Sequence, residues 1–270
     1  MNAADFEYLS TVLRQRSGLV LSTEKGYLLE SRLLPIARDQ GLETLEDLVN
    51  LMRTKNDEKL LSAVTEAMTT NESFFFRDDR PFTIFREDTL PGLIEARSDK
   101  KHLRIWCAAA STGQEPYSLA MIIKDMEAQL AGWRIEILGT DLSSEVLEKA
   151  KVGLYSQFEV QRGLPIQLLM KYFEQKNEMW QINDTIRGMV QYKPFNLLDS
   201  FTSLGKFDVI FCRNVLIYFD QETKTDILER MSKLVAPDGS LFLGGAETVI
   251  GVTDKFAPVS GKRGVYGLAA

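Results

Sequence analysis

The C-terminal two thirds of the chain alternate short apolar runs with segments of helical periodicity, and this alternation constrains the fold more than any other feature. Runs with the length and composition of buried strands occur at Leu103–Cys107, Arg134–Gly139 and Phe207–Cys212. Helices are predicted over Pro116–Leu130 and Thr223–Leu234. Successive strand–helix–strand units place their strands in parallel through right-handed crossovers. The sequence therefore predicts an α/β fold with a doubly wound sheet.

The C-terminal end predicts a different strand arrangement. Pro237-Asp238-Gly239 has the composition of a turn, and a strand is predicted after it at Ser240–Leu243. Lys255–Val259 and Gly264–Leu268 are then predicted to form an antiparallel hairpin. A parallel sheet that ends in an antiparallel hairpin resembles the sheet of class I S-adenosylmethionine (SAM) methyltransferases.

The segment from about residue 155 to 195 interrupts the alternation. Met179–Ile182 and Met189–Tyr192 have the composition of strands, and Asn183-Asp184 between them suits a turn. These runs predict a small antiparallel β insertion. Pro194–Leu198 is then expected to return the chain to the main sheet.

Residues 1–80 have helical periodicity. A helix is predicted to begin at Ser22 or Thr23 as N-cap, with a kink near Leu34 because Pro35 follows it. Two further helices are predicted at Thr44–Met52 and Glu58–Met68. We therefore expect an all-helical domain over residues 1–80 and a second domain over residues 81–270, which carries the β insertion.

Composition excludes several classes of protein. The hydrophobic fraction of 44% and the charged fraction of 26% are those of a globular protein, and no apolar run approaches the roughly 18 residues of a membrane span. A net charge of −6 argues against a general nucleic-acid binder. The first residues lack the apolar segment of a signal peptide, and Cys107 and Cys212 lie in predicted strands. We therefore expect two buried thiols in a cytoplasmic protein.

The only histidine, His102, precedes the first predicted strand. A Ser-His-Asp mechanism or a histidine-rich metal site is therefore not expected, and no metal is predicted. Any chemistry must depend on carboxylates, arginine, tyrosine, asparagine or a cofactor.

The stretch Leu103–Ser118 is the strongest candidate for a ligand-binding turn. A strand leads into the small residues Ala108–Gly113, and a helix begins again with Pro116 in its first turn. Glu115 at this helix start would repel a pyrophosphate and would favour a ligand with a cationic end. Taken alone, the stretch fits an ordinary tight turn equally well.

Asp141 follows the second predicted strand, where doubly wound folds place an acid on ribose hydroxyls. An N-cap for a helix over Ser144–Lys151 is an alternative role that is compatible with the first.

Phe74, Phe75 and Phe76 fit neither a helix face nor an alternating strand. We interpret them as a hydrophobic plug between two units, with the polar residues around them directed into a cleft.

Several motifs together resemble one family over almost the whole chain, namely the chemotaxis receptor methyltransferases (CheR). The matching blocks are Thr70–Ser73 with Arg77, Ala108–Gly113 with Glu115–Ser118, Thr140-Asp141, Asn196–Leu198, and Phe211–Val215 with Ile217–Phe219. Five blocks in the same order are more specific than any single motif. The resemblance implies methyl transfer from SAM to glutamate side chains on the cytoplasmic helices of chemoreceptors, with S-adenosylhomocysteine as the product.

The resemblance also implies the site residues. The SAM pocket would include Asn71, Ser73, Arg77, Glu115, Asp141, Asn196, Leu197, Arg213 and Asn214. Arg77 and Tyr218 match positions next to the transferred methyl group, and Ser73 replaces an expected threonine. Arg32 and Arg38 lie in the part that would face the receptor, where Pro35 stands in a stretch that is more basic in some relatives.

The β insertion departs from the family pattern. Some relatives carry a glycine-rich turn there that docks a pentapeptide at the receptor C-terminus, whereas this chain has Glu174–Glu178 without glycine. We therefore expect no dependence on such a tether. The expected protein is a cytoplasmic monomer that has no nucleic-acid partner, does not insert into a membrane, and is recruited to membrane receptor arrays.

Three other functions were weighed against receptor methylation. A SAM methyltransferase for a small molecule is disfavoured by the helical domain and the β insertion, which suit a protein substrate. A SAM-binding adaptor without catalysis is disfavoured because Arg77 and Tyr218 are both present. A nicotinamide oxidoreductase is disfavoured by Glu115 and by the missing spaced glycines.

Overall fold

The computed structural model describes residues 1–22 and 26–269, which cluster into two units. The first unit contains Met1–Thr70 and the separate segment Tyr218–Thr223. The second contains Asn71–Ile217 and Lys224–Ala270. Each unit has its own hydrophobic core, and each is described by itself below.

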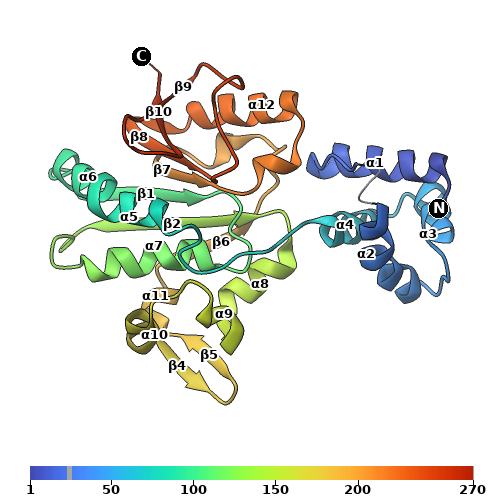
Figure 1. The fold of residues 1–270 in the computed structure, drawn as a ribbon, viewed down its shortest axis with the longest axis horizontal. Helices are drawn as coiled ribbons and strands as arrows, with labels where there is room; N and C mark the ends of the chain where they lie inside the picture. Colours follow the sequence, from blue (N-terminus) through green and yellow to red (C-terminus); the bar gives the residue numbers. More distant parts are fainter. Residues whose placement is uncertain (23–25, 270) are drawn as a thin grey trace. The chain divides into compact units, whose positions relative to one another are not determined.

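A seven-stranded sheet organises the second unit, in the order β6-β2-β1-β7-β8-β10-β9 (Figure 1). Its strands are β1 (His102–Cys107), β2 (Arg134–Asp141), β6 (Val190–Pro194), β7 (Phe207–Cys212), β8 (Val235–Leu243), β9 (Phe256–Pro258) and β10 (Val265–Leu268). The strands from β6 to β8 are parallel, and β10 is antiparallel to both of its neighbours. The predicted α/β sheet with a closing antiparallel hairpin is thus confirmed.

Helices follow or precede the strands of this sheet. They are α5 (Arg80–Ile84), the π-helix η2 (Phe85–Thr89), α6 (Leu90–Ala96), α7 (Gln114–Asp125), α8 (Ser144–Val152) and α12 (Gln221–Ser232), with a 3-10 turn η3 (Phe201–Ser203). Phe211 of β7 stacks on Phe242 of β8 with ring centroids 4.4 Å apart, and it also meets the edge of Phe85. The apolar strands are buried on both faces because helices and aromatic rings cover them.

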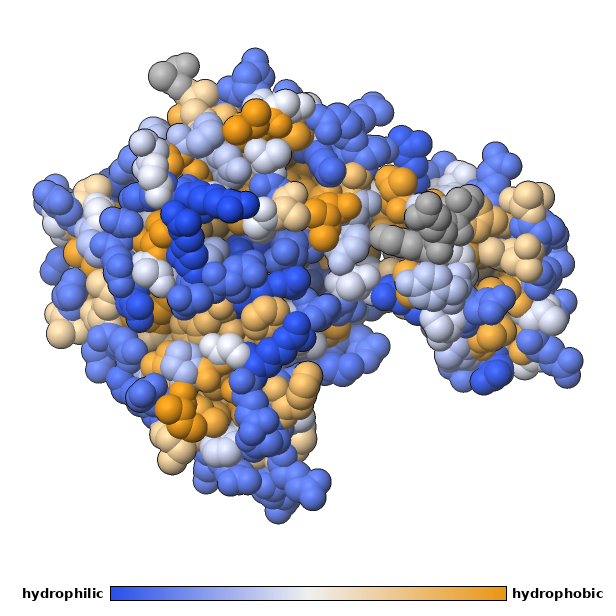
Figure 2. Space-filling model, viewed as in Figure 1, coloured by the Kyte–Doolittle hydropathy of each residue, from blue (hydrophilic) through white to orange (hydrophobic). Residues whose placement is uncertain are grey.

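The predicted antiparallel insertion is confirmed as a smaller sheet, with strands in the order β3-β5-β4. It contains β3 (Leu154–Ser156), β4 (Phe173–Lys176) and β5 (Met179–Ile182), together with α9 (Gln157–Gln161), α10 (Ile166–Tyr172) and α11 (Asp184–Arg187). Exposed apolar side chains lie on its helices, Phe158 on α9 and Ile166 and Met170 on α10, and Figure 2 shows hydrophobic residues over this region.

The prediction that Met189–Tyr192 is an antiparallel strand of this insertion is wrong. Val190–Pro194 forms β6, the edge strand of the main sheet, and pairs in parallel with β2. The expected turn at Asn183-Asp184 is the start of α11, with Asn183 as its N-cap. A short apolar run has the same local composition whichever strand it joins, so the sequence pattern did not identify the partner.

The turn predicted at Pro237–Gly239 lies inside β8. The pairing of β7 with β8 runs from Phe207↔Val235 to Val209↔Ser240, so the extra residues form an irregularity in a continuous strand. A side chain on Gly239 would come within 2.6 Å of the Asp208 carbonyl oxygen. Turn-forming residues are therefore used here for a bulge, which has similar backbone demands.

Four helices form the first unit: α1 (Ala3–Ser17), α2 (Gly26–Asp39), α3 (Leu45–Lys55) and α4 (Glu58–Met68). Leu9, Leu29, Leu48 and Val64 are fully buried in their common core. Helix α2 includes Pro35, so the proline that follows the predicted kink near Leu34 does not end the helix. Pro35 is exposed, and water can hydrate the carbonyl group that loses its amide partner. Of the two predicted N-caps of this helix, Thr23 lies outside the described residues, and Ser22 is the last residue described before that gap.

Among the helices described, none is long and apolar enough to cross a membrane.

Candidate functional site

Apart from Lys101 and Asn177, the non-glycine residues described with positive φ in the second unit fall in three loops. Phe76, Asp78 and Asp79 have φ values of 50°, 68° and 46°, Ser111 has 49°, and Asn214 has 57°. These left-handed conformations are unusual for residues other than glycine, and they concentrate at functional sites. Two of the loops directly follow β1 and β7, which are neighbours in the sheet.

The small-residue turn Ala108–Gly113 is fixed by the strands on both sides of β1. The amide of Ala108 donates to the Phe211 carbonyl oxygen of β7, and the amide of Ala110 donates to the Thr140 carbonyl oxygen of β2, both at 2.8 Å. The turn is thus held at the carboxyl edge of the sheet, where doubly wound folds bind ligands.

Asp141, the last residue of β2, is buried and binds the backbone of this turn. Its carboxylate accepts the Ser111 amide at 2.9 Å and the Ser143 amide at 3.0 Å. The N-cap of α8 is Ser143, whose hydroxyl accepts the Val146 amide, so the alternative role of Asp141 as that cap is wrong. The carboxylate is therefore oriented by two backbone donors at the sheet edge.

Glu115 and Arg213 form a buried ion pair, with 2.9 Å between Oε2 and Nη1. Nη2 of Arg213 donates to the Arg77 carbonyl oxygen at 2.8 Å and to Asp78 Oδ2 at 2.7 Å. Burial raises the pKa of the Glu115 carboxyl, and the Arg213 guanidinium opposes that rise. Arg213 thus joins the start of α7 to the strained loop that contains Arg77.

Arg77 presents a cation to this site. Its Nη1 donates to the Glu72 carbonyl oxygen at 2.9 Å, and its guanidinium lies 5.5 Å from the centre of the Phe74 ring. Within the described residues, no carboxylate lies at ion-pair distance from it. Arg77 can therefore pair with an anionic ligand group without displacing a carboxylate of the protein.

Asn71 and Ser73 begin the same segment. The Asn71 carbonyl oxygen accepts the Ser111 hydroxyl at 2.6 Å, which ties the segment to the turn after β1, and Ser73 is half-buried. Phe75 is fully buried within the second unit's own core, where it meets Tyr155 and Phe173 edge to face.

Asn196 and Leu197 follow β6, the strand beside β2. The Phe195 amide donates to the Asp141 carbonyl oxygen at 2.9 Å, which brings Asn196 to the same edge as Asp141. The Asn196 side chain accepts the Leu198 amide at 3.0 Å, and Leu197 is buried. The SAM-pocket residues predicted in this unit thus lie at one edge of the sheet, at a strand end, in a loop or at a helix start, or on the segment bonded to that edge.

These residues fit SAM by their chemistry. A fixed carboxylate at the end of the second strand suits ribose hydroxyls, and the small residues of Ala108–Gly113 allow close approach of a ligand to the backbone. Arg77 suits the carboxylate of an amino-acid tail. Glu115 shares its charge with Arg213, so its interaction with a cationic amine would be weaker than that of an unpaired carboxylate.

Glu247 is a site residue that the sequence patterns did not predict. Its buried carboxylate accepts the amides of Asn214, Val215, Leu216 and Gly244 at 2.7–2.9 Å, and that of Ile217 at 3.3 Å. The loop after β7 is thus held by one side chain from the loop after β8. A signal was present, because Gly244-Gly245-Ala246-Glu247 repeats the pattern of small residues and then an acid that follows β1.

Tyr218, Arg32 and Arg38 belong to the first unit. The Tyr218 carbonyl oxygen accepts the Val20 amide at 3.0 Å, and nearby Asp220 pairs with Arg14 at 2.6 Å. Arg32 donates to the carbonyl oxygens of Met68 and Thr69 at 2.8 and 2.9 Å and therefore caps the C-terminal end of α4.

Arg38 is exposed near the end of α2. Within the part of the unit that the structure describes, the two predicted receptor-facing arginines thus differ: the Arg32 side chain donates to backbone carbonyl groups, and the Arg38 side chain does not.

Two family models match the chain. Residues 71–265 match the CheR methyltransferase SAM binding domain, and residues 4–69 match the CheR methyltransferase all-alpha domain. Chemotaxis protein methyltransferase 1 of Pseudomonas aeruginosa is 42% identical over 97% of this chain and 96% of its own length. Chemotaxis protein methyltransferase Cher2 of Pseudomonas putida is 40% identical over the same shares. The chemotaxis protein methyltransferase of Vibrio anguillarum is 39% identical, again over 97% and 96%.

Proposed function

This chain belongs to the CheR methyltransferase family, and from that membership we infer that its acceptors are glutamate side chains of chemoreceptors. The protein is a SAM-dependent protein methyltransferase of chemotaxis. In the proposed reaction a glutamate carboxylate oxygen forms a bond to the methyl carbon while the bond from that carbon to sulfur breaks. The products are a glutamyl methyl ester and S-adenosylhomocysteine.

The observation that carries the choice of acceptor is the position of His102. This histidine lies at the amino end of β1 and contacts Glu136 at 3.0 Å, whereas the candidate site lies at the carboxyl ends of the strands. An amine or hydroxyl acceptor would need to lose a proton, but a glutamate carboxylate is already ionised near neutral pH. An acceptor that needs no general base agrees with a site that has no histidine beside it.

The protein's contribution to catalysis would be binding and positioning. When bound, SAM supplies an electrophilic methyl group on a sulfonium cation. Arg77 would pair with a carboxylate at the site, and Tyr218 would donate a hydrogen bond to the acceptor carboxylate. Positioning of this kind can lower a barrier by about 7–11 kcal/mol at most. Exclusion of water favours the step further, because the two opposite charges are partly neutralised as they react.

Each predicted pocket residue has a proposed role. Asp141 would bind ribose hydroxyls. Glu115, while paired with Arg213, would also interact with the cationic end of SAM. The remaining contacts would come from Asn71, Ser73, Asn196, Leu197 and Asn214.

The helical unit is the proposed receptor-facing part. Arg38 is exposed and would contact an acidic receptor surface directly, while Arg32 would support the same face by fixing the end of α4.

The small β-sheet supports the proposal that no receptor tether is needed. Its strands β4 and β5 are joined by Asn177 and Glu178 alone, with Asn177 in the left-handed conformation at φ 56°. This tight turn contains no glycine, in contrast to the glycine-rich turn expected of tether-dependent relatives. We propose a monomer that reaches receptor arrays through the methylated region itself.

The test is transfer of labelled methyl from SAM to cytoplasmic receptor fragments, with and without their C-terminal tails. Base-labile label on tailless fragments is expected. Label only on tailed fragments would keep the activity and overturn independence from the tether. Bound SAM with no label on any fragment would instead favour a small-molecule acceptor.

A further inference from the structure

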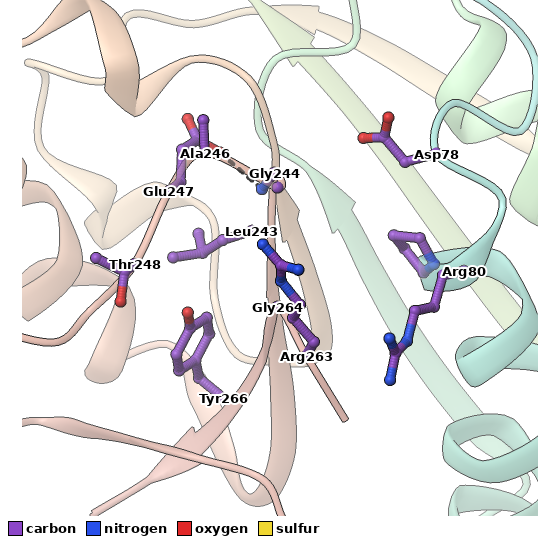
Figure 3. A pocket seen from close by; sticks show the side chains of 12 residues that line it. Asp78, Arg80, Leu243, Gly244, Ala246, Glu247, Thr248, Arg263, Gly264 and Tyr266 are labelled. Carbon is purple, nitrogen blue, oxygen red and sulfur yellow. Dashed lines mark hydrogen bonds between the residues drawn. The ribbon is translucent and has the colours of Figure 1, made fainter. Parts of the chain in front are cut away.

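A pocket of about 460 Å³ lies in the second unit beside the candidate site (Figure 3). Asp78 and Arg80 form one wall, and the segment Gly244–Thr248 after β8 forms the opposite wall. Arg263 and Tyr266 complete the lining from the loop before β10 and from β10 itself. The volume is within the range of small-ligand sites and is large enough to hold an amino-acid side chain.

Backbone hydrogen bonds fix the loop that carries Arg263. The Leu243 amide donates to the Gly264 carbonyl oxygen at 2.9 Å, and the Val265 amide donates to the Lys262 carbonyl oxygen at 3.1 Å. Arg80 donates from the opposite wall to the Gly261 carbonyl oxygen at 3.4 Å. Arg263 therefore extends from an anchored turn.

The two arginines of the lining are available to an anionic ligand. The two carboxylates are already engaged, Asp78 with Arg213 and Glu247 with backbone amides. Arg80 and Arg263 form no ion pair with any residue that the structure describes. Two guanidinium groups thus lie at one pocket without a described carboxylate of the protein at ion-pair distance, so both can form charged hydrogen bonds to a carboxylate ligand.

The pocket adjoins the residues assigned to methyl transfer. Asp78 directly follows Arg77 and binds Arg213, so one wall of the pocket is part of the site's ion-pair network. On the other wall, a side chain on Gly244 would come within 2.9 Å of the Asn214 amide nitrogen. A group bound in the pocket would thus lie next to the proposed acceptor.

We propose that this pocket binds a second acidic side chain of the protein substrate, near the glutamate that is methylated, through Arg80 and Arg263. This inference rests on the proposed function and adds a determinant of substrate choice to it. The apolar surfaces of Pro81 and Tyr266 would hold the methylene groups of that side chain. A glutamate in acidic surroundings would then be preferred over an isolated one.

The experiment uses the full-length protein and two versions of one receptor fragment. One version keeps the acidic residues that flank the methylated glutamate, and in the other they are replaced by glutamine. Initial rates of methyl transfer are measured for wild type, Arg263→Ala, Arg80→Ala and the matched control Arg134→Ala. Arg134 is an exposed arginine at the amino end of β2, the end of the strand remote from the site.

For the acidic fragment, KM is expected to rise about 5- to 20-fold in Arg263→Ala and Arg80→Ala, with a smaller change in kcat, and to stay at the wild-type value in Arg134→Ala. For the glutamine fragment, wild type should already show the higher KM, and the two pocket variants should add less than about twofold to it. Equal effects of Arg263→Ala on both fragments, or no effect on either, would overturn the proposal. If wild type labels neither fragment, the proposed acceptor itself is wrong and the pocket proposal fails with it.

Discussion

Glu115 and Arg213 are both buried and lie 2.9 Å apart between carboxylate and guanidinium, although 98 residues separate them in the chain. Breaking a buried pair leaves one charge without a partner, which costs about 3–5 kcal/mol. We expect Arg213→Met to lower the free energy of unfolding by about that amount in urea denaturation. Replacing both residues, as in Glu115→Gln with Arg213→Met, should cost clearly less than the sum of the two single changes. Additive losses would show that the two side chains do not stabilise each other.

Glu247 is expected to control the order of the loop after β7. Glu247→Gln keeps the size of the side chain but removes the charge and one acceptor site, and charged hydrogen bonds contribute about 1.5–3 kcal/mol each. Hydrogen exchange of the Val215, Leu216 and Ile217 amides should therefore accelerate about tenfold or more. Exposed Glu222→Gln is the control.

Gly244→Ala offers an independent check of the same contact. Its new methyl group would come within 2.7 Å of Glu247 Oε2, so it should accelerate exchange at the same amides. Unchanged exchange in both Glu247→Gln and Gly244→Ala would rule out a positioning role for Glu247.

Asp141 and Tyr218 should separate SAM binding from methyl transfer. Asp141→Ala removes the proposed ribose contact and the anchor of the Ser111 amide, so the Kd for SAM in calorimetry should rise about tenfold to a hundredfold. Tyr218→Phe should leave that Kd near the wild-type value and lower kcat about tenfold or more. Equal loss of SAM affinity in both variants would contradict this division of roles.

Replacement of Arg32 should lower stability, whereas replacement of Arg38 should weaken receptor binding. Arg32→Ala removes the cap of α4 and should lower the stability of the protein by about 1–2 kcal/mol in thermal unfolding. Arg38→Ala should leave stability unchanged and raise KM for receptor fragments. A stable Arg32→Ala protein with an increased KM would instead give Arg32 a direct receptor contact.

Asp220 gives a pH-dependent prediction. The Thr223 amide and hydroxyl, with Arg14, lower the pKa of Asp220, so its contribution is present above the unfolded-state pKa and is lost as the pH falls through the lower folded-state value. Asp220→Asn should be about 1 kcal/mol less stable than wild type near pH 7, and the difference should shrink below about pH 4. Exposed Asp254→Asn is the matched control. A difference that is constant with pH would exclude the carboxylate as its source.

The architecture could be predicted because it depends on local sequence patterns of apolar runs and helical periodicity. The alternation of apolar runs with helices specified the parallel strands, and it placed Asp141 and the turn after Cys107 at one edge of the sheet. Strand composition does not record which strand will be the partner, so Met189–Tyr192, most of which lies in β6, was predicted in the wrong sheet. The bulge at Asp238 was mistaken for a turn for a similar reason, because both need the same backbone flexibility.

The site was less predictable than the fold because its contacts join distant segments. The Glu115–Arg213 pair and the five amides around Glu247 depend on the order of strands, which no local window contains. Arg32 was predicted to face the receptor, but its hydrogen bonds to the end of α4 could be identified only from the structure. Residues that bind backbone groups at long range have no periodic pattern and are therefore missed.

The membership of Tyr218–Thr223 in the first unit has a consequence for how such proteins can be recombined. The helical unit is not a simple N-terminal module, since a cut after Thr70 would separate Val20 and Arg14 from the segment that they contact. A chimera that takes its helices from one relative and the remainder from another must also match this short internal segment. The two units therefore cannot be exchanged independently of the residues near position 220. Tyr218, which is proposed to orient the acceptor, lies within that segment.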